Sequence, residues 1–319
     1  MLSRVAENLY WLGRYLERTD DVARLADVNY QAAVEQAPEG DEQMWDAVIA
    51  ALGAREAYAR ALQEEPGLRP AQFLVYSTSH PGSLRSNIAD ARRLARELRE
   101  HISREVFEEI NGLFLGAGRG DDDQQSLHAL YRSVKRSVAA TIGMFDNTVL
   151  LTEGREWFRC GLFFQRAEMT SRIVDAKYFI LLPEREDVGG PIDRYQWMAI
   201  LRSASALEAF RKRYRGAVTA PRVVQLLLFD DEFPRSLVFC VSGLKRHFLG
   251  ATAQSPASRT VHAAREAAIL ELDLQAANAN DVIRAGLHEF LEDVRVRLLR
   301  IHGALEAQIF HALPEEPVA

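Results

Sequence analysis

The sequence contains only two cysteines, Cys160 and Cys240, among its 319 residues. They do not form a Cys-x-x-Cys pair and both stand in apolar surroundings, which is typical of buried thiols in a reducing compartment and not of a disulfide framework or a zinc site. The chain also lacks an apolar run of about 18 residues, the length that a membrane-spanning helix requires. Its first residues are charged and do not resemble a signal peptide. The sequence therefore predicts a cytoplasmic protein that makes no contact with a membrane.

Runs of basic residues are absent as well. The 39 lysines and arginines are spread along the chain, and the net charge is −6, so we expect no nucleic-acid partner. The eight histidines are scattered and none follows a glutamate at the Glu-x-x-His spacing of di-iron bundles, which predicts no metal site. The glycine-rich segment 116–120 does not follow a strand, as a dinucleotide fingerprint would, and we expect no cofactor.

Apolar residues recur at helical spacing along most of the chain, and no alternating run of β-branched residues is long enough for a sheet. The sequence predicts an all-α protein: a large helical bundle that forms a single domain over residues 1–319. If the chain forms two halves, the acidic and glycine-rich loop 183–191 would separate residues 1–183 from 192–319. Long helices are predicted at about 3–34, 126–151 and 154–182, and others include 193–214, 220–229, 234–249, 257–276 and 279–312.

The predicted first helix, residues 3–34, is partly repeated 148 positions later in the helix 154–182. Within the segments 10–30 and 158–178, a glycine, two arginines, two acids and a tyrosine occupy matching places, and Glu17 is matched by Gln165. In each copy an acid precedes an arginine by four residues and another acid follows by three, which predicts an acid–arginine–acid ladder along one flank. The matching residues are Gly13 and Gly161, Arg18 and Arg166, Asp20 and Glu168, Arg24 and Arg172, Asp27 and Asp175, Tyr30 and Tyr178.

The second copy is apolar on nearly all sides, which is typical of a central helix. Its arginines would then be partly buried and would require carboxylate partners. We therefore expect the two signature helices to pack against each other about an approximate two-fold axis, with their Glu, Arg and Asp side chains interlocked. Gly13 and Gly161 would suit a close approach of the two helices.

Three interpretations of this charged cluster remain open. It can be an internal salt-bridge network that holds the bundle together, or a site at which arginine forks grip a carboxylate or phosphate. It can also be catalytic, with Glu17 as the acid or base, although no nucleophile-and-base pair accompanies it. The candidate binding residues are Arg14, Glu17, Arg18, Asp21, Arg24, Arg166, Glu168, Arg172 and Asp175.

The opening SRVAENLYWLGRYLERTDDVARLADV and the second copy QRAEMTSRIVDAKY resemble the Alpha-E family, helical bacterial proteins marked by a Glu-Arg pair. Here that pair is Glu17-Arg18. The segments PGSLRSNIADARRLARELREHIS and LFDDEFPRSLVFC also resemble family segments, so the resemblance covers nearly the whole chain. The second copy departs from the family pattern, because Gln165-Arg166 replaces a second Glu-Arg pair and a neutral amide cannot act as an acid or base.

The resemblance implies a functional context. Such proteins are encoded beside, or fused to, circularly permuted ATP-grasp proteins and transglutaminase-like cysteine peptidases, which implies these two as partners in making or modifying peptide amide bonds. The leading interpretation is an accessory or binding protein of that system. The alternatives are an enzyme that acts on the peptide intermediate through Glu17 and the neighbouring arginines, and a non-catalytic scaffold that docks the ligase to the peptidase.

Overall fold

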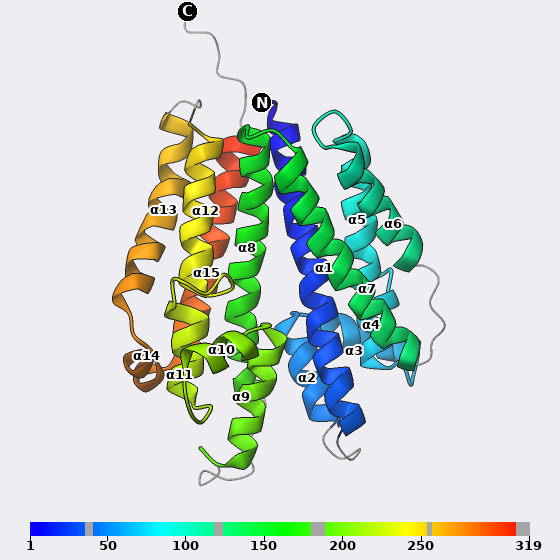
Figure 1. Ribbon diagram of the computed structural model, residues 1–319, viewed down its shortest axis with the longest axis vertical. Helices are drawn as coiled ribbons and strands as arrows, with labels where there is room; N and C mark the ends of the chain where they lie inside the picture. Colours follow the sequence, from blue (N-terminus) through cyan, green and yellow to red (C-terminus); the bar gives the residue numbers. More distant parts are fainter. Residues whose placement is uncertain (36–40, 118–123, 180–188, 254–256, 311–319) are drawn as a thin grey trace, which may run out of the picture.

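The computed structural model describes residues 1–35, 41–117, 124–179, 189–253 and 257–310. All regular structure in these ranges is helical, and they contain no strand. The longer helices run side by side along the longest axis of the molecule (Figure 1). The prediction of an all-α protein without a sheet is confirmed.

Fifteen α-helices are found in the described ranges. The first seven are α1 (Ser3–Glu35), α2 (Asp41–Ala51), α3 (Arg55–Glu64), α4 (Pro70–Tyr76), α5 (Leu84–Glu97), α6 (Arg104–Ala117) and α7 (Gln124–Thr148). The others are α8 (Glu153–Asp175), α9 (Pro191–Ser203), α10 (Leu207–Arg213), α11 (Ala220–Val224), α12 (Leu237–Ala251), α13 (Ala257–Ala276), α14 (Ala279–Ala285) and α15 (Leu287–Leu305).

The long helices form two rings of four. In the first ring α1 contacts α5, α5 contacts α6, α6 contacts α7, and α7 returns to α1. In the second ring α8, α12, α13 and α15 contact one another in the same cyclic order. Figure 1 shows α1 and α8 adjacent at the centre, with the other helices of each ring on the outer sides of this pair, and the buried apolar residues of both rings form one continuous core.

The division of the chain into domains stays a prediction. The helix contacts nevertheless group α8 with α12, α13 and α15. A boundary at residues 183–191 would therefore separate α8 from the helices with which it forms a ring. The turn between α7 and α8 lies closer to the point at which one ring ends and the other begins.

Helices α5 and α12 hold the same position in the two rings, next to α1 and α8, and each begins with a serine cap. Ser83 Oγ accepts a hydrogen bond from the backbone N–H of Ser86 at 3.1 Å, and Ser236 Oγ accepts one from Phe239 at 3.1 Å. Such caps satisfy backbone donors that a helix start leaves unpaired. The predicted start of the second helix at 234 is wrong, because α12 begins only at Leu237 and Pro234 lies in the preceding turn.

Three other predicted helices end earlier than expected. The helix predicted at 193–214 is two helices, α9 and α10, which are separated near Ser205 with its φ of 52°. The helix predicted at 279–312 is divided at Gly286, whose φ of 121° is incompatible with a continuous helix. Helix α8 stops at Asp175 and passes into a 3₁₀ turn over 176–179, and residues 180–182 of the predicted helix lie outside the described ranges.

The two signature helices α1 and α8 pack directly against each other, as expected. A Cβ atom placed on Gly13 would overlap the carbonyl oxygen of Phe158, and one placed on Gly161 would overlap that of Tyr10. Because Tyr10 and Phe158 are themselves matched in the repeat, the two contacts are reciprocal. The glycines let the backbones approach more closely than any side chain would permit, around an approximate two-fold axis.

Helix α8 is the central helix that its sequence predicted. Phe158, Leu162 and Met169, which face away from its main apolar stripe, are all buried. Both cysteines are buried and unpaired, and burial raises the pKa of each thiol, to about 12 for Cys240. The prediction that Cys160 and Cys240 are buried thiols outside a disulfide is therefore confirmed.

Within the described ranges, none of the helices combines the length and the apolar character that crossing a membrane requires.

Candidate functional site

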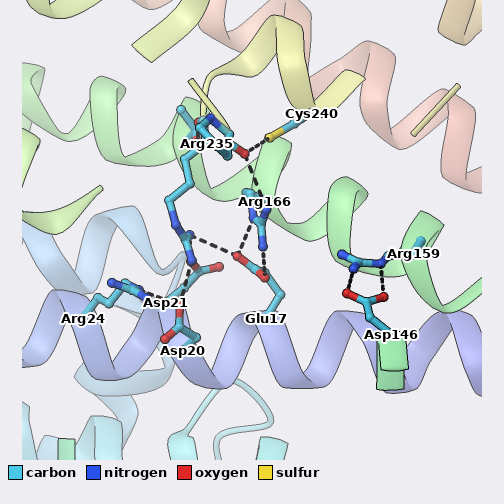
Figure 2. Close-up of polar contacts among 11 residues, drawn as sticks. Glu17, Asp20, Asp21, Arg24, Asp146, Arg159, Arg166, Arg235 and Cys240 are labelled. Carbon is cyan, nitrogen blue, oxygen red and sulfur yellow. Dashed lines mark hydrogen bonds and ion pairs between the residues drawn. The ribbon is translucent and has the colours of Figure 1, made fainter. Parts of the chain in front are cut away.

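The carboxylate of Glu17 is fully buried between α1 and α8. Arg166 of α8 donates two parallel hydrogen bonds to it, from Nε to Oε1 at 2.8 Å and from Nη2 to Oε2 at 2.8 Å. Nη1 of Arg235, a residue in the turn before α12, lies 3.0 Å from Oε1 (Figure 2). The two parallel bonds between Arg166 and Glu17 form a bidentate fork, the strongest arrangement that an arginine and a carboxylate can adopt.

Arg235 also joins two further acids of α1. Its Nη2 lies 2.8 Å from Oδ2 of Asp20, and its Nη1 lies 3.4 Å from Oδ1 of Asp21. Arg24 completes the group with an Nε–Oδ2 distance of 2.5 Å to Asp20. Three acidic side chains thus meet three guanidiniums, and we call this group the Glu17 half-site: Glu17, Asp20, Asp21, Arg24, Arg166 and Arg235.

The titration behaviour of the Glu17 half-site follows from these contacts. Burial alone would raise the pKa of Glu17, but the charges of Arg166 and Arg235 outweigh burial and lower it to about 2. The pKa of Arg166 is raised, because the Glu17 charge and hydrogen bonds outweigh the effect of burial. Burial and the adjacent charge of Glu17 raise the pKa of Asp21. Glu17 is therefore a permanent carboxylate at neutral pH.

A second group of polar residues occupies the corresponding position on the other side of the helix pair. The amide oxygen of Gln165 accepts hydrogen bonds from Arg18 Nη2 at 3.0 Å and from Arg14 Nη2 at 3.3 Å. Glu168 receives Arg14 Nη2 at 3.1 Å and Arg172 Nη2 at 3.0 Å. We call Arg14, Arg18, Gln165, Glu168 and Arg172 the Gln165 half-site.

The two half-sites are related by the same reciprocity as the glycine contacts. In the first half-site, Glu17 of α1 bonds Arg166 of α8, and in the second, Gln165 of α8 bonds Arg18 of α1. An acid three residues after Glu17 or Gln165 bonds the arginine four residues further along its own helix. The related contacts are Glu17–Arg166 with Arg18–Gln165, and Asp20–Arg24 with Glu168–Arg172. The expected interlocking of the two helices is confirmed.

The predicted ladder is correct for its first rung and wrong for its second. The Asp20–Arg24 and Glu168–Arg172 pairs form within each helix. Asp27, however, turns to His128 and Lys135 of α7, with an Nδ1–Oδ1 distance of 2.6 Å and an Nζ–Oδ2 distance of 2.5 Å. Asp27 thus pairs with a neighbouring helix of its own ring instead of with Arg24, the arginine three residues before it.

Asp175 behaves like its match Asp27. It pairs with His288 and Arg295 of α15, at 2.6 Å from Nδ1 to Oδ1 and 2.8 Å from Nη1 to Oδ2. Asp175, a predicted binding residue, therefore belongs to neither half-site. The side chains of Tyr30 and Tyr178, the last matched pair of the repeat, lie outside the described part of the chain.

Arg14 is the most enclosed arginine of the Gln165 half-site, with a side chain that is 6% exposed. Its guanidinium lies 4.6 Å from the ring centre of Trp11 and 4.5 Å from that of Phe164, an arrangement that stabilises a cation between two aromatic faces. Its Nη1 also lies 3.4 Å from Nε2 of His302. Burial and the positive charge of Arg14 lower the pKa of His302 to about 4.

This depressed pKa predicts a pH-dependent stability. An unfolded histidine takes up its proton near pH 6.5, whereas His302 in the folded chain does so near pH 4. As the pH falls between these values, the unfolded state binds the proton first and folding is weakened. From pH 7 to pH 5, the free energy of unfolding should therefore fall by about 2 kcal/mol more for the wild type than for His302→Gln.

Urea denaturation at the two pH values measures this difference, and His101→Gln, at an exposed position, is the control. Contributions from the other histidines are common to the wild type and His302→Gln and cancel in their difference. An equal loss of stability in the wild type and in His302→Gln would contradict the assigned pKa.

The structure brings eight of the nine predicted binding residues into the two half-sites and leaves out only Asp175. Sequence reasoning missed Arg235, which contacts three acids of α1. The available signal was the similarity of the turns Pro81-Gly82-Ser83-Leu84 and Pro234-Arg235-Ser236-Leu237, which precede corresponding helices. A single arginine in one of the two turns gives no indication of its partners until the helices are placed.

The acids of the Glu17 half-site are the residues most suited to hold a metal. One oxygen from each of Glu17, Asp20 and Asp21 lies within 4.8 Å of the other two, and carboxylates are the ligands that hard cations prefer. Arg235 already contacts all three side chains within 3.4 Å. The chain thus supplies its own positive charge to this acidic group, and the prediction of no metal stays a prediction.

Two four-helix rings joined through a pair of repeated helices, with Glu/Gln-Arg pairs interlocked between them, define a class of helical protein built around a buried Glu-Arg motif. The chain matches the Alpha-E family, described as a predicted alpha-helical domain with a conserved ER motif, over residues 1–310. The protein belongs to the Alpha-E family.

Among curated proteins, uncharacterised proteins of Mycobacterium bovis and Mycobacterium tuberculosis are 24% identical to the chain over 292 residues. The match covers 80% of this chain and 30% of each relative. The chain thus spans about a third of the length of these relatives. No significant match to a solved structure was found.

Proposed function

We propose that the protein is a non-catalytic accessory protein of a system in which an ATP-grasp ligase makes or modifies peptide amide bonds, and that the Glu17 half-site is a clasp that joins its two helical rings. The two partners are inferred from the resemblance of the Glu-Arg signature and its repeat to the Alpha-E family. A circularly permuted ATP-grasp protein and a transglutaminase-like peptidase are the proposed partners.

The state of Glu17 is the observation that carries the non-catalytic role. Its carboxylate is 1% exposed and is held by Arg166 and Arg235. A general acid or base needs a pKa near the working pH and must reach the proton that it moves. A permanent carboxylate that has a pKa of about 2 and is buried in contact with two guanidiniums meets neither condition.

Two alternative functions make different predictions. An enzyme acting through Glu17 would lose its turnover when this carboxylate is replaced by an amide of the same shape. A scaffold that only docks the ligase to the peptidase would affect the coupling of the two proteins and would leave the ligase alone unchanged.

Reconstitution with the ATP-grasp protein encoded beside this chain tests the proposal. ATP turnover and amide formation would be measured for the ligase alone and with wild-type chain, Glu17→Gln, or the exposed-site control Arg104→Met, whose side chain is 82% exposed. The chain should raise amide formation, and Glu17→Gln should do so equally at temperatures at which circular dichroism shows it folded. The stimulated rate should also show no carboxyl titration between pH 5 and 8.

A chain that leaves amide formation unchanged would overturn the accessory role. A folded Glu17→Gln variant that loses more than about 100-fold in rate, with the wild type showing a carboxyl titration, would favour the enzyme instead. Stimulation that requires the peptidase as well as the ligase would favour the scaffold.

A further inference from the structure

The two half-sites are built alike but differ in charge. In the Glu17 half-site, three acids oppose three guanidiniums. In the Gln165 half-site, the three guanidiniums of Arg14, Arg18 and Arg172 oppose a single carboxylate, that of Glu168. Two substitutions within the repeat account for the difference, because neutral Gln165 takes the place of Glu17, and Met169 takes the place of Asp21.

Arg18 is the residue most affected by the missing acids. Its only hydrogen-bond partner among the described residues is the amide oxygen of Gln165, at 3.0 Å, and no carboxylate in those ranges lies within ion-pair distance. The same oxygen also accepts from Arg14, so one neutral atom serves two cations. Burial and the positive charge of Arg14 lower the pKa of Arg18, which remains charged because arginine does not lose its proton in proteins.

The positive charge of this half-site extends beyond Arg18. Burial lowers the pKa of His80, in the turn before α5, and the positive charge of Arg18 lowers it further. Arg14 cannot move away to water, since it is packed between Trp11 and Phe164. A partly buried guanidinium without a counter-charge is costly, and a bound anion would remove that cost.

Solvent reaches the Gln165 half-site, unlike the Glu17 carboxylate. The side chain of Arg172 is 33% exposed, and that of Arg18 is partly exposed. Gly53, whose φ is 66°, lies beside the guanidinium of Arg172, where a Cβ atom would be 3.1 Å from Nη1. Arg172 and Arg18 are therefore the arginines of this half-site that a dissolved anion can reach.

We propose that Arg14, Arg18 and Arg172 form a binding site for a single oxyanion group, a carboxylate or a phosphate, which takes the place that acidic side chains fill in the Glu17 half-site. Guanidinium forks match the paired oxygens of both groups. This inference deepens the proposed function and rests on it for its biological meaning, because it gives the accessory protein a ligand class: an acidic peptide side chain or terminus, or a phosphorylated intermediate.

Calorimetric titration of the full chain, without any partner protein, tests the site. The probes are inorganic phosphate and a triglutamate peptide blocked at both ends, with triglutamine as the uncharged control and sodium chloride holding the ionic strength constant. The wild type and Arg104→Met should bind at least one probe saturably. Phosphate and peptide results distinguish the two sources of the anion.

Gln165→Glu is the decisive variant, because it restores the acid of the other half-site at the atom that already contacts Arg14 and Arg18. It should weaken binding of the anion at least about tenfold and raise the melting temperature measured without ligand. Arg18→Met should also lose binding. Because Arg18 has no ion-pair partner among the described residues, this substitution breaks no ion pair that the fold needs.

Absence of saturable binding of both probes to the wild type would overturn the inference. So would wild-type affinity in Gln165→Glu and Arg18→Met. Since the titration needs no ligase, its failure leaves the reconstitution result intact, and failure of the reconstitution does not alter the titration.

Discussion

Replacing Glu17 with alanine should cost about 3–5 kcal/mol of the free energy of unfolding, the range measured when one partner of a buried ion pair is removed. The variant would leave Arg166 and Arg235 facing each other without the carboxylate that both contact. The remaining acids, Asp20 and Asp21, already hold Arg235. Arg166 would retain a weak hydrogen bond to the Pro234 carbonyl, at 3.4 Å, and its position 5.7 Å from the ring centre of Phe163.

Urea unfolding at neutral pH measures this loss. The control is Glu108→Ala, which removes the exposed partner of Arg104 on α6 and should leave stability nearly unchanged, because exposed pairs contribute little. The double variant Glu17→Met/Arg166→Met should be less destabilised than the sum of its single variants, since it leaves fewer buried charges without partners. A wild-type stability for Glu17→Ala would show that the pair is not a clasp.

Gly161→Ala should destabilise the protein by at least about 3 kcal/mol, at or beyond the upper end of the usual cost of overpacking. The added Cβ would overlap the carbonyl oxygen of Tyr10 and lie 3.1 Å from the backbone nitrogen of Arg14. Backbone atoms inside a helix cannot turn aside as a flexible side chain can. The two helices would have to separate, which would lengthen the ion pairs of both half-sites.

Gly13→Ala should have a comparable effect, because it makes the reciprocal contact with Phe158. Gly112, in the exposed part of α6, has no atom within 4 Å of an added Cβ, so Gly112→Ala should stabilise the protein by about 0.5–1 kcal/mol. Thermal unfolding of the three variants provides the comparison. Equal melting temperatures for Gly161→Ala and Gly112→Ala would contradict the close contact of α1 and α8.

The packing of α1 against α8 could be predicted because the same pattern of residues occurs in both helices. A glycine and a Glu/Gln-Arg pair at the same spacing in two helices are the features that a reciprocal contact requires, and the burial of Arg166 followed from the apolar residues around it. The boundaries of α9, α10, α14 and α15 were less predictable. Ser205 and Gly286 interrupt helices whose apolar periodicity continues on both sides.

The partners of individual charges were the least predictable part of the site. Spacing along α1 and α8 predicted that Asp27 and Asp175 would pair with arginines of their own helices. Each instead pairs with a histidine and a basic side chain on a neighbouring helix of its own ring. An intrahelical pair of this kind contributes only a few tenths of a kcal/mol, too little to compete with two partly buried contacts.

The sequence by itself determined the fold class, the pairing of the signature helices and the identity of nearly all the charged residues between them. These properties depend on periodicity and on a repeat, which are local or can be compared along the chain. Only the tertiary structure decided that Arg235 completes one half-site and that the other retains an excess of positive charge. The reason is that a charge is balanced by whatever lies within a few ångströms of it, and for Glu17 that neighbour comes from a turn more than two hundred residues away in the sequence.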